Sequence, residues 1–139
     1  MAERTVAKVH DAQGSPLAVA IEVSGHHLSG DEPIARGGAN LGPTPYDLLT
    51  AALAQCTAMT LRWYAGQHGW PLEHVVVEVE HGKRIEAGGG DAVDAFRKTV
   101  SITGPALTDE QRARLFEAAE RCPVHKTLMG TIRIETVAG

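Results

Sequence analysis

The sequence predicts an α+β fold in which a mostly antiparallel sheet is built around one long central helix. Three observations predict it. Apolar residues alternate in several short segments, a long apolar segment lies between clear helix start and stop signals, and helices do not alternate one for one with strands. A chain of 139 residues has the size of one domain, so we expect a single domain over residues 1–139.

The N-terminal part favours an antiparallel hairpin. Arg4 to Asp11 and Leu17 to Val23 read as strands, and the turn residues between them are typical of a hairpin connection. A short third strand is possible around His26–Leu28. The segment from Gly30 to Gly42 is rich in Gly, Pro, Asp and Asn, and we expect it to be a loop that leads to the central helix.

The central helix has well-marked ends. Thr44 is the expected N-cap, Pro45 the first helical residue and Asp47 the acid of a capping box, while Gly69 is the expected stop. A helix that is apolar on all faces is buried on most of them. One chain of this size has little material to enclose it, which points to a second copy of the chain.

Two further strands and a second helix are expected after Gly69. Val75 to Glu80 alternates as a strand, and Arg97 to Gly104 is its expected partner; between them we expect a mobile hairpin tip. Thr108 begins a helix with a second capping box. Pro123 pushes the preceding residue out of the helical conformation, so this helix should break at Cys122. A closing strand is expected at Thr131–Val137.

Composition excludes several classes of function. The net charge of −4 comes without a basic stripe, so nucleic acid is not an expected partner. The central helix is interrupted by Thr, Gln and Arg, which argues against a membrane span. The N-terminal residues lack the apolar region of a secretory signal, so we expect a cytoplasmic protein with reduced thiols. Two cysteines do not make a disulfide framework.

Each cysteine has two interpretations. Cys56, in the middle of the central helix, is either a small buried hydrophobe or a reactive thiol that needs a nearby cation or donor. Cys122 is either a packed helix-terminal residue or the N-cap of a new turn that begins at Pro123, where unpaired N–H groups would favour a thiolate. His125 and Lys126 follow closely. Metal binding by Cys56, Cys122 and His125 would lack a fourth ligand, and we expect neither metal nor cofactor.

Three residues near the helix start are candidates for a supporting role. Asp47 is most simply the capping-box acid, and Tyr46 either packs or lends its hydroxyl to a site. Arg36 lies on the preceding loop and is our candidate for the cation that activates Cys56, because Arg62 points away from that thiol on the helix.

The segments GGANLGPTPYDLL, AALAQCTAMTLRWYA and CPVHKTL, in this order and spacing, resemble the OsmC/Ohr family of thiol-dependent peroxidases. The sequence looks most similar to the OsmC-like branch with GPxPY-[DE]-LL and CPVH. The resemblance covers nearly the whole chain. It implies an intertwined homodimer whose active sites lie at the subunit interface, which suits the apolar central helix.

The resemblance also implies roles for the two thiols. Cys56 matches the peroxidatic cysteine, which attacks the peroxide and becomes a sulfenic acid, and Cys122 matches the resolving cysteine, which closes a disulfide. A dithiol reductant would restore both. In the best-known members an Arg of the first hairpin and a Glu after the helix-start proline pair beside the reactive thiol. Here Tyr46 follows Pro45, Asp47 comes one place later, and the first hairpin has no Arg.

The leading hypothesis is therefore a cysteine-based peroxidase, related in chemistry to peroxiredoxins, that reduces organic hydroperoxides or hydrogen peroxide in an oxidative stress response. A second hypothesis is a dimer that binds a small apolar ligand at its interface without redox turnover. A third is hydrolysis or acyl transfer with Cys122 as nucleophile and His125 as base.

Overall fold

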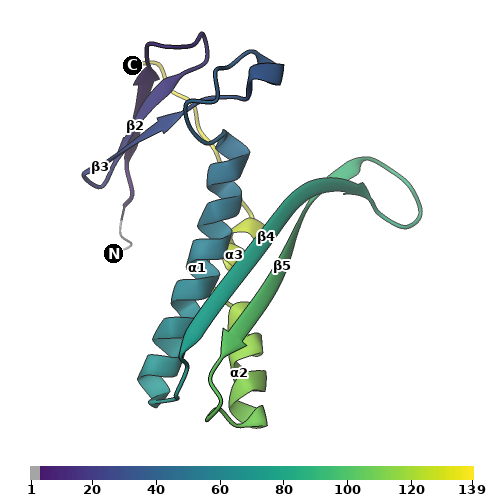
Figure 1. The fold of residues 1–139 in the computed structure, drawn as a ribbon. Coiled ribbons are helices and arrows are strands. Elements are labelled where there is room, and N and C mark those ends of the chain that lie inside the picture. Colours follow the sequence, from purple (N-terminus) through teal and green to yellow (C-terminus); the bar gives the residue numbers. More distant parts are fainter. Residues whose placement is uncertain (1–3) are drawn as a thin grey trace. The chain divides into compact units, whose positions relative to one another are not determined.

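The computed structural model describes residues 4–139. Figure 1 shows the order of elements: three strands, a short 3₁₀ helix, the long helix, a long β-hairpin and two further helices. These residues fall into two compact units, one up to Leu49 and the other from Thr50 onward. Both sheets are antiparallel, so the α+β prediction is confirmed.

The first unit is built on a three-stranded sheet. Its strands β1 (Ala7–Asp11), β2 (Val19–Val23) and β3 (His26–Gly30) pair antiparallel in sequence order. Ser24 and Gly25 connect β2 to β3 with φ values of 50° and 80°, the left-handed conformations that a tight two-residue hairpin turn requires. The predicted hairpin and its third strand are thus confirmed.

Asp31 organises the loop that follows β3. Its side chain is buried, and four donors bind its carboxylate: Ser15 Oγ at 2.9 Å and the backbone N–H groups of Glu32, Ala39 and Leu41 at 2.8, 3.0 and 3.2 Å. Burial raises the pKa of this carboxyl, but the bonds outweigh it and hold the pKa below its ordinary value. The expected loop is therefore ordered, and it contains the 3₁₀ helix η1 (Ile34–Arg36).

Helix α1 (Pro45–His68) begins and ends where its sequence signals predict. The Thr44 N–H donates to Asp47 Oδ2 at 2.9 Å, and the Asp47 N–H donates to Thr44 Oγ1 at 3.1 Å. This reciprocal pair is the predicted capping box. Gly69, with φ of 65°, follows the last helical residue and takes the left-handed conformation that glycine tolerates.

The long hairpin consists of β4 (His74–Ile85) and β5 (Ala92–Thr103). The predicted strands form its base, but the expected mobile tip is wrong over most of its length, since the ladder continues to the pair Ile85↔Ala92. An ion pair across the two strands supports the longer ladder: Lys83 and Asp94 are opposite each other, and Lys83 Nζ lies 3.1 Å from Asp94 Oδ1. The turn proper is confined to the glycine-rich residues 86–91.

Two helices follow the hairpin. Helix α2 (Asp109–Ala119) has the predicted capping box between Thr108 and Gln111. Helix α3 (Pro123–Met129) begins directly after Cys122, which is its N-cap. The predicted helix break at Cys122 is confirmed, and so is the new turn that begins at the proline.

The core of the second unit lies between α1, α2 and the hairpin. It is formed by small and branched apolar residues: Leu61, Ala65, Leu72, Leu107, Leu115, Ala118 and Ala119. Only one face of α1 contributes, through positions three to four residues apart such as Thr57 and Leu61. On another face, Met59 and Trp63 are 60% and 64% exposed. Within this chain, the expected burial of α1 on most faces is not met.

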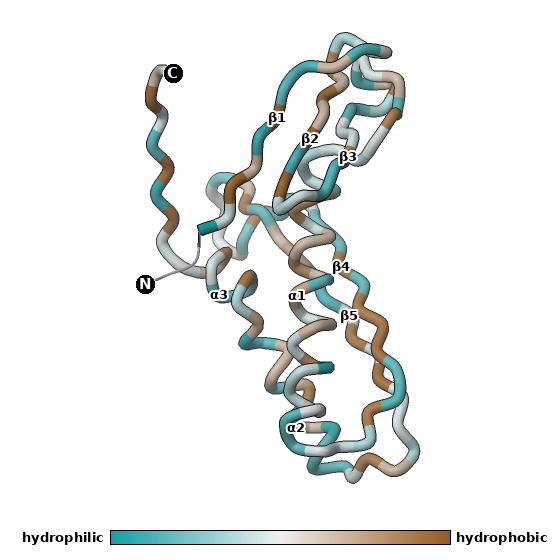
Figure 2. Tube along the Cα trace, turned by 90° about the vertical axis from the view of Figure 1, so that its left-hand side faces the viewer, coloured by the Kyte–Doolittle hydropathy of each residue, from teal (hydrophilic) through white to brown (hydrophobic). Residues whose placement is uncertain are grey.

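The predicted closing strand Thr131–Val137 is wrong for the single chain. Residues 131–139 run beyond α3 as a segment of alternating hydropathy (Figure 2), and they form no strand. Ile132 and Ile134 are 53% and 89% exposed. Alternation determines which face of a strand is apolar, but a strand also needs a neighbouring strand for its hydrogen bonds. Within residues 4–139, no strand pairs with this segment.

Candidate active site

Helix α1 carries Cys56 next to its buried face. The side chain is half-buried, and its Sγ accepts a hydrogen bond from the backbone N–H of Val124 at 3.4 Å. Val124 lies in the first turn of α3, where backbone N–H groups have no partner within the helix. A residue in the middle of one helix thus receives a donor from the start of another.

Cys122 lies at the break between α2 and α3. As the N-cap of α3 it accepts a hydrogen bond from the His125 N–H at 3.3 Å, and Pro123 occupies the first helical position, where it needs no N–H partner. Its side chain is 0% exposed. The chain therefore buries Cys122 but leaves Cys56 partly open to solvent.

The two thiols, far apart in sequence, lie near enough for each to shift the pKa of the other. Both are free cysteines. Burial is the main reason that the pKa of Cys56 lies above its ordinary value; the Val124 N–H lowers it, and the neighbouring Cys122 raises it again. The net effect of these surroundings is to favour the protonated form of Cys56.

Cys122 is shifted in the opposite direction. Burial raises the pKa of Cys122, but hydrogen bonds from Thr57, the His125 N–H and Cys56, together with the charge of Lys98, lower it below the ordinary value of a thiol. The Thr57 hydroxyl lies 3.4 Å from Cys122 Sγ, and Lys98 Nζ lies 4.0 Å from it. Within the pair, Cys122 is the thiol whose ionised form the surroundings favour.

The sequence interpretation missed both Thr57 and Lys98. Thr57 is buried in α1 next to Cys56. Its single hydroxyl hydrogen can donate to the Leu53 carbonyl at 2.9 Å or to Cys122 Sγ at 3.4 Å, and in the first case the Cys122 thiol is the donor to Thr57. Lys98 comes from β5, on the strand face that also carries Val100. A lysine on the inward face of an alternating strand was a signal that could have found it, because lysine is seldom buried without a partner.

His125 pairs with an acid. Its Nε2 lies 3.8 Å from Glu120 Oε2, while its Nδ1 is buried without a hydrogen-bond partner. The sequence offered no orienting acid for His125; Glu120 can serve as one. The ring thus faces Glu120, and it is the backbone N–H of His125 that binds Cys122.

The three candidates near the helix start lie in the first unit. Asp47 closes the capping box, which is the simpler of its two interpretations. The Tyr46 side chain is 52% exposed. Arg36, whose side chain is largely exposed, lies 4.0 Å from Glu32 Oε2, whose side chain is mostly covered. Both cysteines belong to the other unit, and a role for Arg36 or Tyr46 at the thiols stays a prediction.

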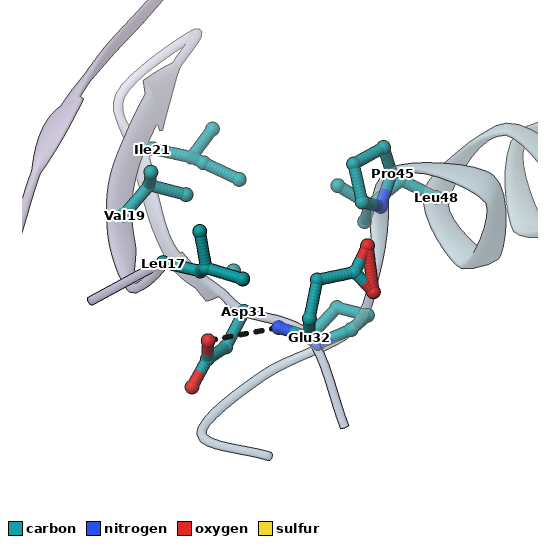
Figure 3. A pocket seen from close by; sticks show the side chains of 9 residues that line it. Leu17, Val19, Ile21, Asp31, Glu32, Pro45 and Leu48 are labelled. Atoms are coloured by element: carbon teal, nitrogen blue, oxygen red, sulfur yellow. Dashed lines mark hydrogen bonds between the residues drawn. The ribbon is translucent and has the colours of Figure 1, made fainter. Parts of the chain in front are cut away.

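The first unit contains an apolar pocket of about 220 Å³. Leu17, Val19 and Ile21 point from the β2 side toward Pro45 and Leu48 at the start of α1 (Figure 3). Glu32 also lines it, and one of its carboxylate oxygens is buried without a hydrogen-bond partner. Among residues 4–139, no group of three or more His, Cys, Asp or Glu residues is placed to hold a metal ion.

The family model for OsmC-like proteins matches residues 37–137, which include α1, the hairpin and both thiols. The chain belongs to the OsmC-like family. The predicted family resemblance is therefore confirmed. No curated protein sequence matches the chain.

Solved structures of other OsmC-like proteins share the fold. An OsmC-like protein from Mycoplasma pneumoniae is 17% identical with a TM-score of 0.74, over 94% of this chain and 90% of that one. An organic hydroperoxide resistance protein from Legionella pneumophila is 24% identical with a TM-score of 0.68, over 92% and 90%. Another from Elizabethkingia anophelis is 19% identical with a TM-score of 0.65, over 94% and 91%. Among the described residues of this family member, none of the helices is both long and apolar enough to cross a membrane.

Proposed function

We propose that the protein is a thiol peroxidase that reduces organic hydroperoxides or hydrogen peroxide, with Cys56 as the peroxidatic and Cys122 as the resolving cysteine. The observation that carries this proposal is the proximity of two free thiols from different helices. Cys56 Sγ accepts a hydrogen bond from the N–H of Val124 on α3, and Cys122 Sγ lies 3.4 Å from the hydroxyl of Thr57 on α1. Peroxide resistance is also the named role of the Legionella and Elizabethkingia relatives.

The chemistry balances with these two groups and a dithiol. Cys56 releases its proton to solvent, and its thiolate attacks the terminal oxygen of the peroxide. The O–O bond breaks, and the other oxygen leaves as an alkoxide, or as hydroxide from hydrogen peroxide, that takes a proton from solvent. Cys56 is oxidised to a sulfenic acid, and the peroxide is reduced to an alcohol or to water. Cys122 then attacks the Cys56 sulfur and expels hydroxide, which is protonated to water. A dithiol reduces the resulting disulfide by exchange.

The partial exposure of Cys56 supports its role as the first nucleophile. A peroxide can reach a half-buried sulfur, whereas Cys122 is fully covered in the resting structure. A buried resolving thiol is protected from direct oxidation by the peroxide. It reacts only with the sulfenic acid that has already formed on Cys56. Such a division of roles suits an oxidative stress response in a compartment where thiols are kept reduced.

A homodimer belongs to the same proposal. Met59 and Trp63 are exposed apolar side chains that lie three and seven residues after Cys56 on α1, and therefore on the same side of the helix. A partner that covers these side chains would bury the apolar surface and bring the active site to the subunit interface.

The direct test is a single turnover. The reduced protein is mixed with one equivalent of cumene hydroperoxide, and its disulfides are mapped by mass spectrometry. We expect a Cys56–Cys122 disulfide and one equivalent of cumyl alcohol. Thiols that stay reduced, while a control peroxidase turns over under the same conditions, would refute the proposal.

The pocket of the first unit favours a second candidate, binding of a small apolar ligand without redox turnover. A ligand that co-purifies with the protein, together with unreactive thiols, would select it. The Glu120–His125 pair keeps the third candidate, a Cys122-dependent hydrolase, open to test. For this candidate, Cys122→Ser would have to abolish esterase activity, and the full burial of Cys122 argues against it.

A further inference from the structure

The thiol pair lies beside a cation that comes from the long hairpin. Lys98 Nζ, on β5, donates a hydrogen bond of 2.7 Å to the carbonyl oxygen of Ala119, the last residue of α2. The last carbonyls of a helix lack partners within the helix and carry partial negative charge, so they attract an ammonium group. This bond holds the ammonium group in place, with Cys122 Sγ 4.0 Å away.

An ammonium group has three donors, so Lys98 can bind the Ala119 carbonyl and face the sulfur at the same time. The other groups around Cys122 Sγ are the Thr57 hydroxyl and Cys56 from α1 and the His125 N–H from α3. Glu120 and His125 flank Cys122 in sequence and pair with each other at 3.8 Å. Among these contacts of Cys122 Sγ, the positively charged group is the ammonium group of Lys98.

We propose that Lys98 stabilises the thiolate form of Cys122, and that this stabilisation speeds both disulfide steps of the cycle: Cys122 is the nucleophile in disulfide formation and the preferred leaving group in reduction by a dithiol. This inference rests on the proposed peroxidase function and adds a positioning residue to it. In this protein, Lys98 takes on an electrostatic role at the resolving thiol, separate from any residue that activates Cys56.

In disulfide formation, the Cys122 thiolate attacks the sulfur of the Cys56 sulfenic acid. The S–S bond forms, the S–O bond breaks, and the hydroxide that leaves takes a proton from solvent. Because Lys98 stabilises the thiolate, a larger fraction of Cys122 is ionised and able to attack without prior removal of a proton. A rapid attack also limits further oxidation of Cys56 to the sulfinic acid.

In reduction, the geometry selects the sulfur that the reductant attacks. Cys56 is the more accessible of the two, and the thiol of lower pKa leaves faster. A thiolate of the dithiol attacks Cys56 Sγ, and Cys122 leaves as a thiolate beside Lys98. The second thiolate of the reductant then attacks the mixed disulfide, which releases Cys56 as a thiolate and leaves the reductant oxidised.

The test must separate the charge of Lys98 from its hydrogen bond to α2. Lys98→Gln keeps a donor for the Ala119 carbonyl but removes the charge, and Lys98→Arg keeps both. Lys83→Met removes another lysine of the same hairpin, one that pairs with Asp94, and is the matched control. Circular dichroism spectra compare the folding of all variants.

The first readout is the thiolate absorbance of Cys122 in the ultraviolet, titrated against pH in a Cys56→Ser background. This readout needs neither access to the sulfur nor peroxide turnover. We expect Lys98→Gln to raise the pKa of Cys122 by about one unit or more, in the range that a charge at 4–6 Å produces. Lys98→Arg and Lys83→Met should leave it close to the parent value.

The second readout is stopped-flow kinetics in the Cys56-containing protein. At neutral pH we expect Lys98→Gln to slow conversion of sulfenic acid to disulfide by about tenfold, with formation of the sulfenic acid within about twofold of wild type. In Lys98→Gln, raising the pH should restore the disulfide step. An unchanged titration together with an unchanged disulfide step would overturn the role of Lys98. If wild type does not react with peroxide, the proposed function fails, while the titration still decides whether Lys98 stabilises the thiolate.

Discussion

The middle of α1 and the break between α2 and α3 each carry one cysteine, and the two regions shift the pKa of their cysteine in opposite directions. Cys56 lies within a continuous helix, partly exposed, with a pKa raised mainly by burial. Cys122 lies at a helix start, fully covered, yet donors and the charge of Lys98 lower its pKa. The more deeply buried thiol is thus the more acidic one.

The difference shows that burial alone does not set the charge of a thiol. Desolvation raises the pKa of both cysteines, and the number and kind of donors decide the outcome. Cys122 has donors from the hydroxyl of Thr57, the N–H of His125 and the ammonium group of Lys98. Cys56 has the Val124 N–H as its backbone donor. This contrast between the two thiols can be tested by substitution and by pH, and the largest effect is expected from the thiols themselves.

Replacing each thiol should have a different consequence. Cys56→Ser should abolish peroxide consumption, because the proposed first nucleophile is gone. Cys122→Ser should still consume one equivalent of peroxide and then stop, with Cys56 found as sulfenic or sulfinic acid by mass spectrometry. If Cys122→Ser loses the first turnover and Cys56→Ser keeps it, the two roles are reversed.

Helix α2, which ends shortly before Cys122, is held in the core by Leu115. Leu115 is 0% exposed in the core, so Leu115→Ala should reduce the free energy of unfolding by about 2–5 kcal/mol. Phe116, on the same helix, is 46% exposed, and Phe116→Ala is the control with an expected loss well below that. Chemical denaturation of both variants measures the difference. Equal losses would contradict the core position of Leu115.

The two thiols should give the cycle two pH limits. A lowered pKa means that Cys122 stays ionised below the ordinary thiol range, so disulfide formation should slow only as the pH falls through that lowered value. A raised pKa means that attack by Cys56 should continue to accelerate as the pH rises above the ordinary thiol range. Stopped-flow measurement of each step against pH tests this order. If the rate of sulfenic acid formation levels off at a lower pH than the rate of disulfide formation, the two pKa shifts are in the opposite order to the one expected.

The hydroxyl of Thr57 should stabilise the thiolate of Cys122. Its hydrogen has two acceptors, the Leu53 carbonyl and Cys122 Sγ, and it can turn to the sulfur when the sulfur is ionised. Thr57→Val keeps the shape but removes this donor, and we expect the pKa of Cys122 to rise by about one unit, since a hydrogen bond to a charged group contributes about 1.5–3 kcal/mol. Thr57→Ser should preserve it. A thiolate titration of both variants in the Cys56→Ser background decides, and equal titrations would show that Thr57 does not stabilise the thiolate.

The smallest expected effect concerns Asp47. If it acts as the capping-box acid, Asp47→Ala should lower the free energy of unfolding by about 0.5–2 kcal/mol and leave the reactivity of Cys56 unchanged. The measurements are chemical denaturation and the rate of sulfenic acid formation. A large loss of Cys56 reactivity with unchanged stability would instead make Asp47 part of the active site.

Features encoded by neighbouring residues could be predicted from the sequence. The capping boxes at Thr44 and Thr108, and the helix break at Pro123, depend on backbone groups a few residues away, and the structure confirms them. The Thr131–Val137 strand failed as a prediction for the single chain, because its pattern specifies an apolar face but no partner strand. The hairpin tip was misjudged because cross-strand pairs such as Lys83 and Asp94 cannot be seen in a local window.

The sequence by itself determined the family, the helix ends and most of the strands, and it singled out the two cysteines, since local patterns and motifs carry that information. The tertiary structure decided which thiol is the acidic one. That outcome depends on Lys98 from β5, Thr57 from α1 and an N–H of α3 meeting at a single sulfur. Charge and hydrogen bonds act over a few ångströms in space, and residues distant along the chain reach that range only when the fold brings them together.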